Sequence, residues 1–182
     1  MNKTYTLNLA LASAVLSIVL FLLMAILNGG MIFSFVIGIV ALVLLIALPI
    51  IFVRRQRKAN NGIISFKEAF LTSFVGLTIG GLIYLAFTYV YVNFIDVNYL
   101  DNMINQQIET TMKFMQGNVP EEQMVETLTE METKIREGFT IQGILKNFGI
   151  YTLVYAVYSL ILAAIMKRKP VFAETAEDII DN

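Results

Sequence analysis

Residues 94–138 read FIDVNYLDNMINQQIETTMKFMQGNVPEEQMVETLTEMETKIREG, and this stretch is polar and acidic in a chain that is otherwise apolar. Asp96 to Thr140 carries nine carboxylates and three cations, a net charge of −6. Hydrophobic residues make up 57% of the 182-residue chain, against roughly 45–50% in ordinary soluble proteins. The composition therefore indicates that this stretch is a polar insert in a membrane protein.

Four apolar runs flank the insert, at residues 7–27, 31–53, 70–95 and 141–166, and Lys146 is the one charged residue within them. Each run is long enough for a bilayer core, which takes about 20 helical residues. None has the polar face of a surface helix. The first run is too long for a signal peptide and is not followed by a small-residue cleavage pattern. We therefore predict an all-α integral membrane fold: a single domain over 1–182, with four transmembrane helices and the insert at 96–140.

The basic residues predict the orientation of the chain. Nine of the 13 lysines and arginines fall on one side of a four-span arrangement: Lys3, Arg54, Arg55, Arg57, Lys58, Lys67, Lys167, Arg168 and Lys169. Cytoplasmic loops carry an excess of such residues. We therefore expect both termini in the cytoplasm, the insert outside it, and the chain in the inner membrane of a bacterium.

The insert shows two amphipathic patterns. Apolar residues recur every three or four positions, first at Leu100, Ile104, Ile108 and Met112, then at Met124, Leu128, Met131 and Ile135. Asp96 is a plausible N-cap, Pro120 fits the first turn of the second helix, and Gly138 fits its end. We predict an extracytoplasmic helical hairpin with these apolar residues as its core. Methionine can bind Cu(I), but the stripe positions favour a packing role.

Composition excludes several kinds of chemistry. The chain has no cysteine and no histidine, so the usual zinc, iron–sulfur, Cys–His and Ser–His–Asp centres are excluded. The carboxylates lack the spacing of a calcium-binding loop. Apart from Lys146 the spans hold no ionisable residue, which argues against an ion pump. We expect no catalytic residue, no metal site and no cofactor.

Glycines and tyrosines mark the third and fourth spans. Gly76, Gly80 and Gly81 include a GxxxG pattern, which lets another helix approach closely, either within the chain or in a dimer. Five tyrosines share helix faces and line either a packed seam or a groove for a lipid: Tyr84, Tyr91, Tyr151, Tyr155 and Tyr158. The deep tyrosines need partners for their hydroxyls, and Ser159, Thr88 and Thr152 are candidates. Ser65 and Glu68 form a capping box at the start of the third span.

The arrangement of these features resembles a known family. ISFKEAF at 64–70, YVNFID at 91–96, NYLDNMINQQIE at 98–109 and KRK at 167–169 resemble small four-span bacterial membrane proteins catalogued as domain of unknown function forty-one ninety-nine. The resemblance implies four helices in the inner membrane of a diderm bacterium. It brings no catalytic residue to this chain.

Two hypotheses for the function follow. In the first, the chain is a non-enzymatic membrane protein whose hairpin docks a partner or a second copy. In the second, it binds or processes a lipid or a small hydrophobic molecule in a tyrosine-lined groove, with help from Asp96 and Asp101, although these two residues share a helix face poorly. We expect membrane lipids and a second copy or another envelope protein as partners, and no nucleic acid.

Overall fold

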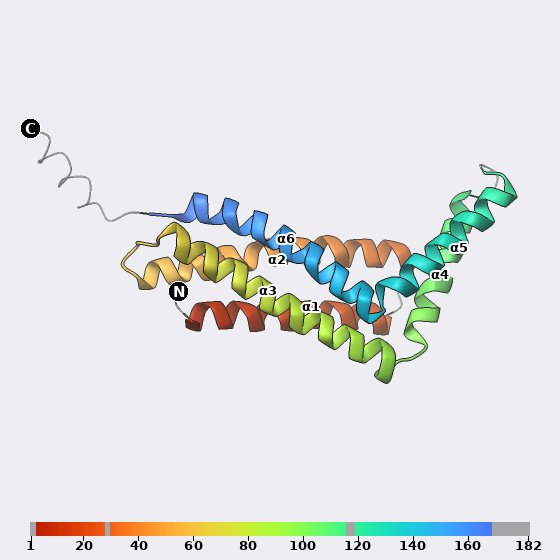
Figure 1. The fold of residues 1–182 in the computed structure, drawn as a ribbon, viewed down its shortest axis with the longest axis horizontal. Coiled ribbons are helices and arrows are strands. Elements are labelled where there is room, and N and C mark those ends of the chain that lie inside the picture. The colour runs from red at the N-terminus through yellow and green to blue at the C-terminus, as the bar shows by residue number, and fades with distance from the viewer. Residues whose placement is uncertain (1–2, 28–29, 116–118, 169–182) are drawn as a thin grey trace, which may run out of the picture. The chain divides into compact units, whose positions relative to one another are not determined.

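The computed structural model describes residues 3–27, 30–115 and 119–168, and Figure 1 shows the helices they form. Within these ranges the predicted all-α class is confirmed, because the chain forms helices and an isolated β-bridge but no strand. The elements are α1 (Lys3–Leu27), α2 (Gly30–Ala59), α3 (Phe66–Val90), the π-helix η1 (Tyr91–Ile95), α4 (Tyr99–Met115), α5 (Glu121–Gly138) and α6 (Ile141–Met166).

In the described part of the chain, four helical stretches are long and apolar enough to cross a membrane: α1, α2, α3 together with η1, and α6. Each predicted span lies within one of them. Large apolar side chains point outward, with Phe35 69%, Leu153 70% and Ile165 73% exposed. Water-soluble proteins rarely expose continuous apolar surface of this kind, whereas lipid chains solvate it. The helices therefore indicate a membrane protein, as predicted.

The chain divides into two compact units, and each is described by itself. Unit one contains the described residues of Met1–Ala14, Val43–Gly81 and Tyr151–Asn182. Its core is a cluster of buried side chains from α2, the turn after it, α3 and α6: Val53, Ile64, Ala69, Leu162, Ala163 and Met166. Unit two contains the described residues of Val15–Leu42 and Leu82–Ile150.

The turn between α2 and α3 is closed at both ends by hydrogen bonds. Asn61 and Gly62 have positive φ angles of 54° and 84°, and the Gly62 N–H donates to the Arg57 carbonyl at 2.9 Å, as in a Schellman C-cap. The predicted capping box is confirmed at the start of α3. The Glu68 N–H donates to Ser65 Oγ at 3.2 Å, and the Ser65 N–H donates to Glu68 Oε2 at 3.1 Å. The turn is therefore fixed by its own residues.

Helix α3 leads into α4 through η1 and a short turn. The Asp96 N–H donates to the Tyr91 carbonyl at 2.9 Å, which closes the π-helical turn. Helix α4 begins at Tyr99, and the Asn98 carbonyl accepts its first helical hydrogen bond, from Asn102 at 3.0 Å. The prediction of Asp96 as the N-cap is therefore wrong, because the N-cap position falls two residues later.

Helix α5 follows the second predicted helix of the insert closely. Pro120 is its N-cap residue, so it lies just before the helix and not in the first turn as predicted, and Gly138 is its last residue. Residues 116–118, which belong to the predicted break between the two helices of the insert, lie outside the described ranges.

Candidate functional site

Helices α4 and α5 pack against each other in unit two (Figure 1). Ile104 is only 2% exposed, and the Thr111 hydroxyl lies 3.8 Å from the sulfur of Met131. Six other stripe residues are half-buried: Leu100, Ile108, Met124, Leu128, Met131 and Ile135. Met112, near the end of α4, is 43% exposed. Ile104 is thus the one buried residue of the α4–α5 pair, and the other stripe residues are half-buried apart from Met112.

The three cations of the α4–α5 pair all form ion pairs. Lys113 lies 2.7 Å from Glu109 and Lys134 lies 2.9 Å from Glu130, each along a single helix. Arg136 pairs with Glu132 at 2.9 Å and with Asp101 of α4 at 2.8 Å, so it links the two helices. The lysine hydrogen bonds lower the pKa of Glu109 and of Glu130, which keeps both ionised. Five carboxylates have no ion pair within the described part of the chain: Asp96, Glu121, Glu122, Glu126 and Glu137.

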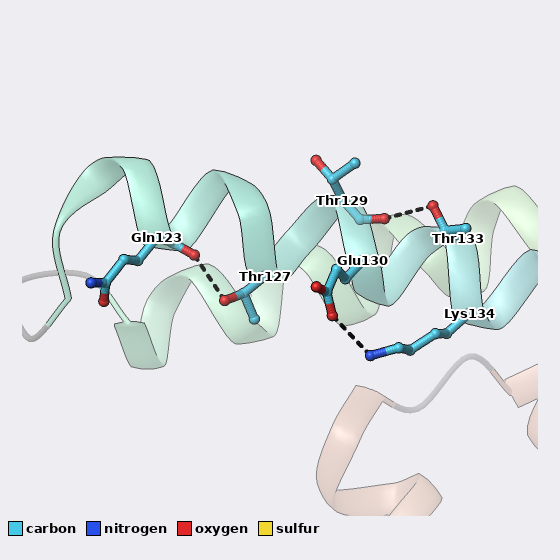
Figure 2. A network of polar contacts seen from close by, with 6 residues as sticks. All are labelled: Gln123, Thr127, Thr129, Glu130, Thr133 and Lys134. Carbon is cyan, nitrogen blue, oxygen red and sulfur yellow. Dashed lines mark hydrogen bonds and ion pairs between the residues drawn. The ribbon is translucent and has the colours of Figure 1, made fainter.

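A shallow hollow of about 410 Å³ lies on α5, with Met131 and Ile135 as its apolar lining and Thr127, Glu130 and Lys134 as its polar lining. Figure 2 shows polar contacts of α5, and three of the residues it labels line the hollow: Thr127, Glu130 and Lys134. The Thr127 hydroxyl donates to the Gln123 carbonyl at 2.8 Å, and the Thr133 hydroxyl donates to the Thr129 carbonyl at 2.9 Å. Of these hydroxyls only that of Thr127 belongs to the lining, and because it bonds its own helix, the hollow is less polar than its composition indicates.

An aromatic cluster joins α4 to two apolar helices within unit two. Phe21 of α1 is 7% exposed, and its ring centroid lies 5.2–6.3 Å from four other rings: Tyr84, Phe87, Tyr91 and Tyr99. Burial, with smaller contributions from Tyr84, Tyr91 and Asp96, raises the pKa of Tyr99 to about 12. The sequence analysis did not single out Phe21, although it is the one aromatic residue in the first apolar run.

Tyr158 of α6 is tied to α2 within unit one. Its hydroxyl donates to the carbonyl oxygen of Ile46 at 2.6 Å. Pro49 lies three residues further along α2, and a proline disturbs the helical hydrogen bonds of the turn before it. Because proline has no N–H, the carbonyl left without its helical donor is that of Leu45, and Tyr158 bonds the next carbonyl along α2. The expectation of a side-chain partner is wrong for Tyr158.

The remaining tyrosines are divided between the two units. Tyr155 lies in unit one against Gly81, where an added Cβ would be 3.1 Å from the tyrosine ring, and Tyr151 is 46% exposed. Tyr84 and Tyr91 belong to the aromatic cluster of unit two. A tyrosine-lined groove remains a hypothesis.

The GxxxG face lies against α1. A Cβ at Gly76 would be 2.8 Å from Leu9, and one at Gly80 would be 2.8 Å from the carbonyl oxygen of Ala10. Such contacts require a close approach of the two backbones. A role of these glycines in joining two copies stays a prediction.

Unit one also buries polar side chains. Gln56 is fully buried, and its Oε1 accepts a hydrogen bond from Thr72 at 2.8 Å. The Gln56 amide nitrogen and the Ser159 hydroxyl have no partner among the described residues. Within the same ranges, no three potential metal ligands come together.

Comparison with known proteins identifies the family but no activity. The family described as Protein of unknown function (DUF4199) matches residues 8–168, which take in the four apolar helices apart from the first residues of α1, and the α4–α5 pair. No curated protein and no solved structure matches the chain. Since the match covers most of the sequence, the chain belongs to the DUF4199 family.

Proposed function

We propose that this chain is a non-enzymatic membrane protein whose α4–α5 pair docks a cationic polypeptide outside the cytoplasm. The charge balance of the pair is the observation that carries the proposal. Its three cations are already engaged in ion pairs, and four of its carboxylates are left without one among the described residues: Glu121, Glu122, Glu126 and Glu137. A surface of this kind attracts positive charge and repels a second acidic surface.

The hollow on α5 adds an apolar element to the docking surface. Met131 and Ile135 lie beside the exposed Glu130–Lys134 ion pair, and Glu126 lies one turn before Glu130 on the same helix. A partner that places an apolar side chain in the hollow and basic residues around it would match both features. A second copy of the chain fits less well, because two α4–α5 pairs would bring like charges together.

The test is site-specific photo-crosslinking in cells, with the crosslinker at Val125, which is 58% exposed and lies next to Glu126. A crosslinker at Leu153 of α6 serves as the control for contacts with neighbours in the membrane. We expect a crosslinked protein at Val125 whose contacting segment, identified by mass spectrometry, is basic.

Charge variants decide whether the carboxylates matter. Replacing Glu121, Glu122 and Glu126 together by Gln should abolish the crosslink. Replacing both Glu109 and Lys113 by Gln leaves the net charge unchanged, and this variant should still form the crosslink. The proposal is wrong if the triple variant crosslinks as well as the wild type, or if Val125 crosslinks only to a second copy.

A further inference from the structure

Unit one carries a cluster of positive charge, in contrast to the negative charge of the α4–α5 pair. Seven cations lie in three short segments, and we call them the basic end: Arg54, Arg55, Arg57, Lys58, Lys67, Lys167 and Arg168. Six of them are exposed and Arg57 is half-buried. This inference does not depend on the proposed role of the α4–α5 pair.

Among the described residues, unit one offers the basic end little counter-charge. Glu68 is the one carboxylate among the described residues of unit one, and Ser65 occupies it through a backbone N–H at 3.1 Å and a hydroxyl at 2.9 Å. All four ion pairs among the described residues lie in the α4–α5 pair of unit two. Some of these cations complement the carboxyl end of the α2 dipole, but one helix end carries only about half a unit of negative charge.

The backbone holds the segments of the basic end together. The Arg168 N–H donates to the Ile64 carbonyl at 2.9 Å, and the Ile64 N–H donates to the Arg168 carbonyl at 3.3 Å. This bridge places the chain after α6 beside the turn that joins α2 and α3 (Figure 1). Ile64 is fully buried, and Lys67 follows it by three residues. Cations from different parts of the sequence therefore belong to one fixed surface.

The position of the basic end along the apolar helices indicates what neutralises it. Lys146 and Lys167 bracket the apolar stretch of α6, and at about 1.5 Å per residue they are about 31 Å apart along the helix. The hydrocarbon core of a bilayer is about 30 Å thick, so Lys167 would lie at the level of the lipid headgroups. The Arg55 guanidinium lies over the Phe52 ring at 5.8 Å, an arrangement that suits a cation at an apolar boundary.

From this charge, order and position we infer that the basic end is a binding site for the phosphate groups of anionic phospholipids. Clustered lysines and arginines next to membrane-spanning helices attract anionic headgroups, which the cytoplasmic leaflet supplies. The lipid provides the negative charge that the described residues of unit one do not supply.

The test uses the full chain in nanodiscs that contain equal amounts of phosphatidylglycerol and phosphatidylcholine. The lipids that stay with the protein after mild extraction are counted by mass spectrometry. We expect the wild type to retain phosphatidylglycerol in preference. The combined variant Lys67→Gln, Lys167→Gln, Arg168→Gln should lower that preference by about tenfold or more, since each basic residue near a membrane surface contributes roughly fivefold.

Two matched variants make the result specific. Replacing Lys113, Lys134 and Arg136 by Gln changes the net charge by the same amount, and it should leave the preference unchanged. The charge-preserving variant Lys67→Arg, Lys167→Arg, Arg168→Lys should also keep the preference for phosphatidylglycerol. Circular dichroism checks that every variant is folded. The inference is overturned if the wild type shows no preference, if both charge-removing variants lose it equally, or if excess inorganic phosphate displaces the lipid.

Discussion

The basic end and the α4–α5 pair carry opposite charges and differ in where those charges find partners. In the α4–α5 pair every cation meets a carboxylate of the same pair, and the surplus is negative. At the basic end the cations have no ion pair among the described residues, and the nearby Glu68 is held by Ser65. The pair therefore supplies part of its own neutralisation, whereas the described residues of unit one form no ion pair with the basic end.

The two regions also differ in what fixes their shape. The turn at the basic end is held by backbone bonds, namely the Gly62–Arg57 C-cap and the Ile64–Arg168 bridge. The α4–α5 pair is held by half-buried side chains and by the ion pair between Arg136 and Asp101. Backbone hydrogen bonds persist when exposed side chains are changed, whereas a packed interface is weakened when the side chains that form it are changed. The comparison predicts that mutations will affect the two regions differently.

The first prediction would break the comparison outright, since it asks whether the two regions lie on opposite sides of a membrane. The distribution of lysine and arginine predicts that the insert lies outside the cytoplasm and both termini inside it. An alkaline phosphatase reporter, which is active only outside the cytoplasm, should be active when fused after Gly117 and silent when fused after Asn182. The opposite pattern would reverse both regions and remove the argument for lipids of the cytoplasmic leaflet.

The second prediction concerns the close packing of unit one. Gly80→Leu places a side chain where a Cβ alone would lie 2.8 Å from the Ala10 carbonyl, so it should destabilise the protein by about 3 kcal/mol or more. Gly38→Leu is the matched control, because nothing lies within 4 Å of a Cβ at Gly38. Thermal unfolding in detergent measures both, and Gly80→Ala should fall between them. Equal melting temperatures for the two leucine variants would show that α1 and α3 are not in close contact.

Local features of this chain could be predicted from its sequence, whereas contacts between distant residues could not. The lengths of the apolar runs and the Ser65–Glu68 capping box are local properties, and both were predicted correctly. The contacts of Phe21 and the bond from Tyr158 to Ile46 depend on residues more than 60 positions apart, so periodicity along one helix carries no information about them. Tyr158 was expected to need a partner, but the partner is a backbone carbonyl near Pro49, and no side-chain pattern identifies it.

For the candidate site, the sequence revealed the excess of negative charge but not its arrangement. That Lys113 and Lys134 lie four residues after Glu109 and Glu130 is visible in the sequence, and helix geometry makes such pairs meet. The pairing of Arg136 with Asp101 follows only once α4 and α5 are packed together. The Ile64–Arg168 bridge is likewise a consequence of the fold, so the basic end could not be identified as one surface beforehand.

The third prediction tests whether side-chain packing holds the α4–α5 pair. Ile104 is 2% exposed, so Ile104→Ala should cost about 2–5 kcal/mol of local stability. Met112→Ala, at a position 43% exposed, should cost under about 1 kcal/mol. Amide hydrogen exchange across residues 99–115 and 121–138 measures the difference. If the wild type exchanges as fast as Ile104→Ala, the pair is not stably packed.

The fourth prediction concerns the aromatic cluster at the start of α4. Burial raises the pKa of Tyr99 to about 12, so the folded protein holds the phenol proton more tightly than the unfolded chain does. This contribution is complete below the ordinary tyrosine pKa of about 10 and is lost as the pH rises towards 12. The stability of the wild type should therefore fall with pH in that window, and Tyr99→Phe should flatten the fall. If stability falls equally steeply with pH in Tyr99→Phe and in the wild type, then folding does not raise the pKa of Tyr99.

The last prediction has the smallest expected effect and tests the internal ion pairs of the α4–α5 pair. Arg136 and Asp101 are about half exposed, and surface ion pairs contribute little because water and salt screen them. Arg136→Gln should lower the melting temperature slightly at low salt, with the difference disappearing at high salt. Lys113→Gln, which removes an ion pair within α4 only, should have a smaller effect because it does not link two helices. A double-mutant cycle with Asp101→Asn separates the contribution of the link from that of Glu132. A large, salt-independent loss in Arg136→Gln would show instead that this link, and not apolar packing, holds the two helices together.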